Sequence, residues 1–152
     1  MERPNFNFTP HFTYREMTDS ATARRLGISN EPGLVEMDNL QHLCSSVLEP
    51  LRAWYGQPVL VTSGYRSEEL NYRVGGVGDS AHIHGAAADL HIRDTDEGRS
   101  FYWFIKTRCR FDQLLWEYGR GGACWIHVAS WKDGSGRANR MMDIPNYRVR
   151  NA

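Results

Sequence analysis

SAHIHGAAAD, at residues 80–89, is the stretch that decides how this chain folds and what it binds, and WIHV at residues 125–128 completes it. Gly85 lets the backbone turn out of a loop. The small residues after Gly85 lead into a strand from about 87 to 92 and leave room above the backbone. The two stretches are therefore expected to meet in one sheet with polar side chains between them.

Three side chains in these stretches have the chemistry of metal ligands. His82, Asp89 and His127 offer two imidazoles and one carboxylate. Catalytic zinc sites use three such protein ligands and leave the fourth position to water or substrate, whereas structural sites use four. The sequence therefore predicts one zinc ion per chain, held by these three residues.

Two other histidines and one cysteine are close enough in the sequence to be considered for this site. His84 follows His82 by two residues and is the alternative ligand, although we place it in the cleft wall or beside a ligand. His91 would face the ligand side of its strand. Cys124 and His127 form a C-x-x-H pair, but residues three apart on a strand point to opposite faces, so both could not easily reach one ion.

Composition places the chain among ordinary globular domains. With 152 residues, 41% hydrophobic and 24% charged, we expect one domain spanning 1–152. Eighteen basic and eighteen acidic residues cancel, which argues against nucleic acid or an anionic membrane as partner. No apolar run approaches the roughly 20 residues that span a bilayer. The start of the chain lacks the layout of a secretion signal, so we expect synthesis in the cytoplasm.

Apolar periodicity and punctuating residues predict an α+β fold built on one mainly antiparallel sheet. Thr13 with Glu16 has the form of a capping box, and Ser20 is a second N-cap. Helices are expected over 21–26, 35–55, from 67 to about 75, and from a cap at Thr95 or Asp96 to 108. Strands are expected over 59–62 (buried), 87–92, 113–118, 125–130 and at an edge near 140–144. Three cysteines with irregular spacing predict no disulfide.

The two stretches fit the pattern S-x-H-x-x-G-x-A-x-D followed by W-x-H, and three further blocks accompany them. These are SGYRS at 63–67, FDQLLWE at 111–117 and an opening stretch over 12–32. In these blocks the chain resembles the D-alanyl-D-alanine carboxypeptidase family of zinc peptidases, and the opening is similar to its phage and prophage branch. The resemblance covers about 10–145 and implies the fold shared with the Hedgehog amino-terminal signalling domain.

Glu117 is the candidate proton carrier. It ends the first strand of the expected hairpin and His127 lies on the second, so the turn would bring them together; the alternative is a solvent-exposed glutamate. In the endopeptidase and dipeptidase branches of the family the acid lies three residues before the last His, where this chain has Cys124. The assignment of Glu117 therefore follows the phage-type branch and a loose similarity to Hedgehog.

The resemblance also assigns residues to the substrate. Arg66 would clamp a carboxylate or an oxyanion, for which its fork of donors is suited, unless it only pairs with a structural acid. The expected cleft-wall residues are Tyr65, Asn71, Ser80, His84 and Trp125.

The function that the resemblance implies is zinc-dependent hydrolysis of peptidoglycan stem peptides, as a phage or prophage endolysin that reaches the cell wall by holin-type release. A zinc-containing binding domain with little hydrolysis and a host D,D-carboxypeptidase of wall recycling are the alternatives. The bond cut, D-Ala–D-Ala or L-Ala–D-Glu, depends on loops that the sequence does not place. The sequence does not indicate the oligomeric state, and we expect a monomer.

Overall fold

The computed structural model describes residues 4–134, 140–141 and 149–150, and it is organised around one sheet. The sheet has the strand order β3-β4-β6-β5-β7, with β8 also paired to β5. The first four strands are antiparallel, whereas β7 and β8 run parallel to β5. The strands are β3 (Val61–Ser63), β4 (Ala87–His91), β5 (Gln113–Gly119), β6 (Cys124–Ala129), β7 (Arg140–Met141) and β8 (Val149–Arg150).

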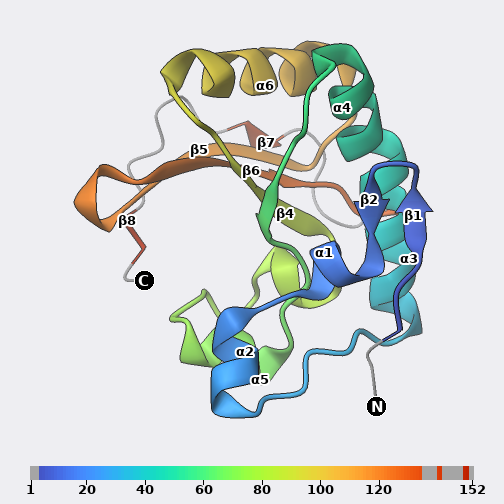
Figure 1. Ribbon diagram of the computed structural model, residues 1–152, viewed down its shortest axis with the longest axis vertical. Helices are drawn as coiled ribbons and strands as arrows, with labels where there is room; N and C mark the ends of the chain where they lie inside the picture. Colours follow the sequence, from blue (N-terminus) through green and yellow to red (C-terminus); the bar gives the residue numbers. More distant parts are fainter. Residues whose placement is uncertain (1–3, 135–139, 142–148, 151–152) are drawn as a thin grey trace.

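Helices cover the sheet at its edges and on one face, and a short hairpin, β1 (Asn7–Thr9) and β2 (Phe12–Thr13), begins the described chain. In Figure 1, α6 lies across the top of the sheet, α3 and α4 run down one side, and α2 and α5 lie at the lower end. The helices are α1 (Tyr14–Thr18), α2 (Ala21–Leu26), α3 (Leu34–Leu43), α4 (Glu49–Tyr55), α5 (Glu68–Arg73) and α6 (Thr95–Arg108). The α+β class with a mainly antiparallel sheet is confirmed.

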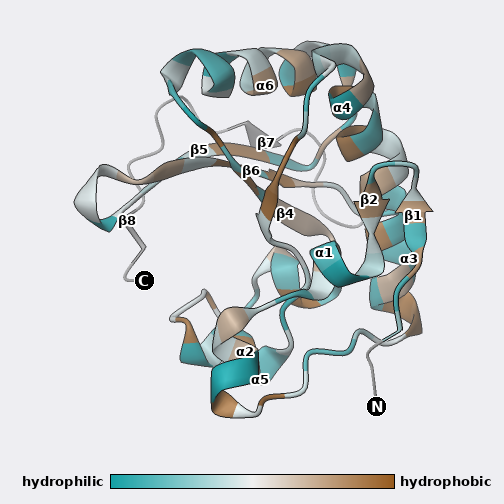
Figure 2. Cartoon of the chain, viewed as in Figure 1, coloured by the Kyte–Doolittle hydropathy of each residue, from teal (hydrophilic) through white to brown (hydrophobic). Residues whose placement is uncertain are grey.

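Alternation along the strands separates a core face from a polar face. Leu90, Ile126 and Leu114 point into the hydrophobic core, where they pack with α6 and the α3–α4 helix. Asp89 and His127 are direct neighbours across β4 and β6, and alternation turns them to the other face. Figure 2 shows α6 hydrophilic at its left-hand beginning and hydrophobic in bands further along, where Phe101, Phe104 and Ile105 pack into the core.

The long helix predicted over 35–55 is present over 34–55, but its middle differs from a regular α-helix. Residues Cys44–Leu48 form a π-helical turn, in which the N–H of Glu49 donates to the carbonyl of Cys44. Pro50 follows directly, and proline both lacks an N–H and crowds the carbonyl four residues before it. The wider turn accommodates this proline without breaking the helix.

Other predicted elements are confirmed with small corrections. Thr13 and Ser20 cap α1 and α2 through their hydroxyl oxygens. The strand predicted over 59–62 lies at Val61–Ser63 and is not buried, since Thr62 is exposed and its two neighbours in the strand are half-buried. Asp94, not Thr95 or Asp96, caps α6, because its carboxylate accepts the N–H of Glu97.

At the carboxyl end, β7 supports the edge strand expected near 140–144 at its first two residues, and 142–144 lie outside the described residues. Within the described part of the chain, no helix is long and apolar enough to cross a bilayer.

Candidate active site

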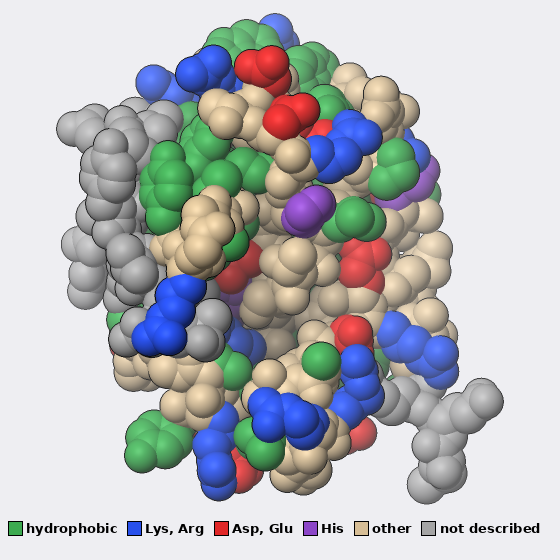
Figure 3. All heavy atoms as spheres, turned by 60° about the vertical axis from the view of Figure 1, so that its left-hand side comes forward, with side chains coloured by type: hydrophobic (Ala, Val, Ile, Leu, Met, Phe, Trp, Pro, Cys, Tyr) green, Lys and Arg blue, Asp and Glu red, His purple; other side chains and the backbone are tan. Residues whose placement is uncertain are grey.

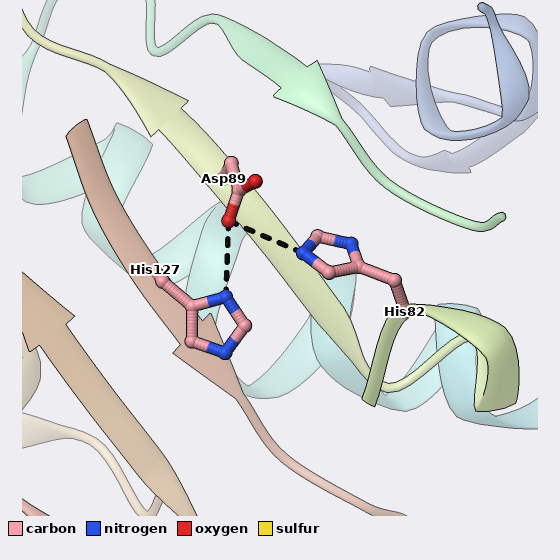
Figure 4. A group of neighbouring side chains, drawn as sticks. All are labelled: His82, Asp89 and His127. Carbon is pink, nitrogen blue, oxygen red and sulfur yellow. Dashed lines mark hydrogen bonds and ion pairs between the residues drawn. The ribbon is translucent and has the colours of Figure 1, made fainter. Parts of the chain in front are cut away.

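Three elements bring the predicted zinc ligands together. His82 comes from a 3-10 helix (Ala81–His84) rather than the loop that the sequence suggested, Asp89 from β4 and His127 from β6. Asp89 Oδ1 lies 3.2 Å from His82 Nε2 and 3.0 Å from His127 Nδ1 (Figure 4). All three residues are buried, and their candidate ligand atoms lie within 4.8 Å of one another. They are the one such group found among the described residues.

The hydrogen bonds behind the two imidazoles set their tautomers. His82 Nδ1 lies 2.7 Å from the carbonyl oxygen of Gly64, and His127 Nε2 lies 3.0 Å from Oε1 of Gln113. Both oxygens can only accept, so in a metal-binding form these two nitrogens would donate their N–H groups to them and the opposite nitrogens would be left to bind the metal. The two opposite nitrogens and Asp89 Oδ1 then form a convergent donor set that a divalent cation such as zinc fits.

Burial and charge favour the protonation states that a metal requires. Burial lowers the pKa of His82 to about 4, so its ring is neutral near pH 7. Burial alone would raise the pKa of Asp89, but His82 and His127 beside it outweigh this effect and hold that pKa well below its usual value. Neutral imidazoles and an ionised carboxylate are the ligand forms, because each must give a lone pair to the metal.

Two glycines allow the backbone to hold His82 in this position. Gly64 lies so close to α1 that a Cβ would stand 2.3 Å from the carbonyl oxygen of Met17. Gly85 ends the 3-10 helix with φ +70°, and a Cβ there would stand 2.4 Å from the carbonyl oxygen of Glu36. Any side chain at either position would push the segment that presents or supports His82 away from its neighbour.

Glu117 lies beside His82, Asp89 and His127, which are called the ligand group below. The hairpin expected from the sequence predicted this position. Glu117 is fully buried on β5, opposite Trp125 of β6, and its Oε1 is 3.7 Å from His127 Nδ1. The indole N–H of Trp125 donates to the same oxygen over 3.1 Å. The carboxylate is thus oriented toward the ligands by a hydrogen bond, although its catalytic role stays a prediction.

Arg66 lies next to the ligand group and is held by its backbone. It is 6% exposed, and its N–H donates to the carbonyl of His82 over 3.1 Å. Asn30 binds the backbone on both sides of Arg66, donating to the carbonyl of Tyr65 and accepting from the N–H of Ser67. Sequence reasoning missed this role of Asn30, whose only signal was its place in the opening block.

A cleft of about 510 Å³ opens beside Asp89. Three of the predicted substrate residues line it: Tyr65, Arg66 and Trp125. The remaining lining residues are Asp19, Ser20, Ala21, Thr22, Arg25, Thr62, Ser63, Leu70, Arg73, Val74 and Asp89. The lining therefore combines arginine, carboxylate, hydroxyl and apolar side chains.

The other three predicted substrate residues do not line this cleft. Asn71 is buried and donates to the carbonyl of Val77, and Ser80 accepts the N–H of His82 as the cap of the 3-10 helix. His84 is half-exposed and pairs with Asp79 instead of supporting a ligand. In the structure these polar groups stabilise loops next to the site.

Cys124 and His91 also stand apart from the ligand group. Cys124 packs against the hydrophobic core, as expected from its spacing to His127, and all three cysteines are free. His91 is exposed at the end of β4.

Comparison with protein-family models identifies the family of the chain. The family model described as Peptidase M15 matches the chain over residues 10–129, a range that contains every residue placed at the site above. A search of curated proteins finds no match.

Proposed function

Since the chain belongs to the peptidase M15 family, we propose that it is a zinc-dependent peptidase that hydrolyses bonds in peptidoglycan stem peptides. One observation carries the proposal: His82, Asp89 and His127 converge as three lone-pair donors at the edge of an open cleft. Zinc bound there would supply Lewis-acid activation of the scissile carbonyl and of water.

In this proposal Glu117 moves the protons. Its Oε1 is held by the indole of Trp125 and lies 3.7 Å from a ligand nitrogen of His127, so it is placed to accept a proton beside the ligand group. The same carboxyl group would then return the proton to the leaving amine. A binding domain without hydrolysis would have no need of a buried carboxylate at this position, which favours the enzyme.

Arg66 would bind negative charge. Its guanidinium is buried in the cleft wall beside His82 and Asp89, where a planar fork of N–H donors can bind a substrate carboxylate or the oxyanion that develops on the carbonyl oxygen. The hydrogen bonds of Asn30 on both sides of this residue fix the backbone from which the fork is presented.

We further propose that the enzyme is a phage or prophage endolysin, made in the cytoplasm and acting on the cell wall after release. The resemblance of its opening stretch to that branch supports this role over a host D,D-carboxypeptidase.

Digestion of purified peptidoglycan tests the proposal. Zinc-loaded protein should release stem-peptide fragments, whose masses identify the bond cut; a chelator should stop the reaction and added zinc should restore it. Glu117→Gln should retain zinc and fold but lose about 10²–10⁴-fold in turnover. Glu31→Gln, which removes an exposed acid from a loop, is the matched control. An inert zinc-loaded wild type, or a Glu117→Gln variant within a few-fold of wild-type turnover, would contradict the proposal.

A further inference from the structure

The cleft has a second wall that the proposed chemistry does not use. The sheet side carries Asp89 and Trp125, whereas the opposite wall is formed by α2 and α5 and includes Arg25 and Arg73. Figure 3 shows a hollow in this face of the molecule, with Lys and Arg side chains gathered below it over the end where α2 and α5 lie. The substrate cleft therefore has a cationic wall facing the ligand group.

Within the described part of the chain, no acidic partner balances the charges of these two arginines, since no acidic side chain there lies within ion-pair distance of Arg25 or Arg73. Asp19, the acid on the same wall, is paired with Arg24 instead. The other lining residues from α2, from α5 and from their caps are neutral: Ser20, Ala21, Thr22, Leu70 and Val74.

Two arginines that line one cleft and have no acidic partner among the described residues fit an anion, and guanidinium groups match carboxylates in geometry. Arg66 already supplies a buried cation beside the ligand group. A substrate that used all three arginines would carry negative charge at two places: one next to the bond that is cut and one across the cleft.

We propose that Arg25 and Arg73 form a subsite for a free carboxylate of the substrate peptide, separate from the reacting carbonyl and from any group bound by Arg66. The subsite rests on the proposed peptidase function and narrows its substrate to acidic peptides. A glutamate linked through its side chain, as in stem peptides, keeps its α-carboxylate free and is the chemical group expected there.

The expected preference for the free carboxylate is set by the solvent exposure of the two arginines. Both arginines are exposed, so water and salt screen them, and each is expected to favour the carboxylate by a factor of about 2–5. The pair should then give a preference of about 4–25-fold, if the two contributions multiply. The preference should shrink as ionic strength rises, because exposed charges are screened within about 10 Å at 0.1 M salt.

Two synthetic peptides test the subsite: one with the free carboxylate and one with the same group amidated. The ratio of their kcat/KM values, and the ratio of their dissociation constants measured by calorimetry on zinc-loaded protein, are compared for wild type, Arg25→Gln, Arg73→Gln and the double variant. Arg99→Gln, which removes an exposed cation from α6, controls for net charge. Melting temperatures and zinc content verify that each variant is folded and loaded.

The double variant should bring both ratios close to one, each single variant should lower them in part, and Arg99→Gln should leave them as in wild type. A wild type that does not distinguish the two peptides, or a double variant that keeps the full preference, would overturn the subsite. If wild type cleaves neither peptide, the peptidase proposal fails, and the ratio of dissociation constants still decides whether the arginines bind the carboxylate.

Discussion

Replacing Gln113 by alanine should weaken zinc binding, although this residue is not a ligand. Its Oε1 lies 3.0 Å from His127 Nε2, so in the zinc-bound form it would accept the N–H of Nε2 and leave the lone pair of the ring on Nδ1, which faces Asp89. Alanine removes this acceptor, so the ring is free to rotate and to carry its proton on Nδ1, where it blocks the metal. Gln113→Glu keeps an oxygen at the same place and should retain tight binding.

The expected magnitude follows from what such supporting hydrogen bonds contribute elsewhere. Loss of a hydrogen-bond partner behind a metal ligand commonly reduces affinity by about 10–100-fold, or about 1.4–2.7 kcal/mol. The same free energy is lost from the stabilisation that zinc gives to the folded protein. For a domain of this size, each kcal/mol shifts the melting temperature by about 2–4 °C, so the zinc-induced shift should shrink by about 3–11 °C.

Two measurements check this prediction. Competition with a chromophoric chelator gives the zinc affinity of wild type, Gln113→Ala and Gln113→Glu, and thermal unfolding with and without zinc gives the induced shift. Comparing each variant with its own zinc-free form removes the small cost of losing one hydrogen bond in the fold. A Gln113→Ala variant with wild-type affinity and an undiminished shift would refute the tautomer argument.

Three further outcomes are expected. Asn30→Ala should lower the free energy of unfolding by about 1–3 kcal/mol, because the backbone on both sides of Arg66 loses its hydrogen bonds. It should also lower turnover per folded, zinc-loaded molecule, and a variant with wild-type turnover would disprove this. Gly85→Ala should destabilise the fold more than Gly56→Ala in chemical denaturation, since both have positive φ but only Gly85 has a neighbouring backbone oxygen within 4 Å. Cys44 should resist thiol reagents until the protein unfolds, as burial raises its pKa, and three thiols should titrate afterwards.

The convergence of His82, Asp89 and His127 could be predicted because the signal for it is local. His82 and Asp89 stand in one short motif, and His127 lies two residues after a tryptophan in a strand that pairs with the first. Side chains alternate between the two faces of a strand, so the spacing of three residues between Cys124 and His127 was enough to place Cys124 on the face away from the candidate ligands. Glu117 could be placed for the same reason, since a hairpin turn fixes its position relative to His127.

The supporting residues could not be predicted, because they act through atoms that carry no local pattern. Gly64 contributes its carbonyl oxygen, and Gln113 and Asn30 contribute amide groups to partners distant in the sequence. Conversely, Asn71 and Ser80 lie beside the motifs and were expected in the substrate cleft, yet in the structure their side chains bind the backbone. The sequence alone does not show whether a polar side chain near a motif faces a bound ligand or hydrogen-bonds to the backbone of a neighbouring loop.

The helix over 34–55 was predicted correctly, but its π-helical turn was not. The spacing of its apolar residues identifies the buried side, but a π-helical turn keeps that side nearly unchanged. Pro50 was the informative residue, since its conflict with the preceding carbonyls requires a local change in helical geometry.

The two faces of the sheet have a consequence for how this protein can change over generations. A substitution in β4, β5 or β6 alters one face at a time, but inserting or deleting one residue exchanges the faces beyond that point, so that Ile126 and His127 would trade environments. Such a length change would turn apolar core side chains to the polar face and candidate metal ligands into the hydrophobic core in a single step. Length variation among descendants of this chain should therefore be confined to turns such as Arg120–Gly122, and the strands should evolve only by replacement.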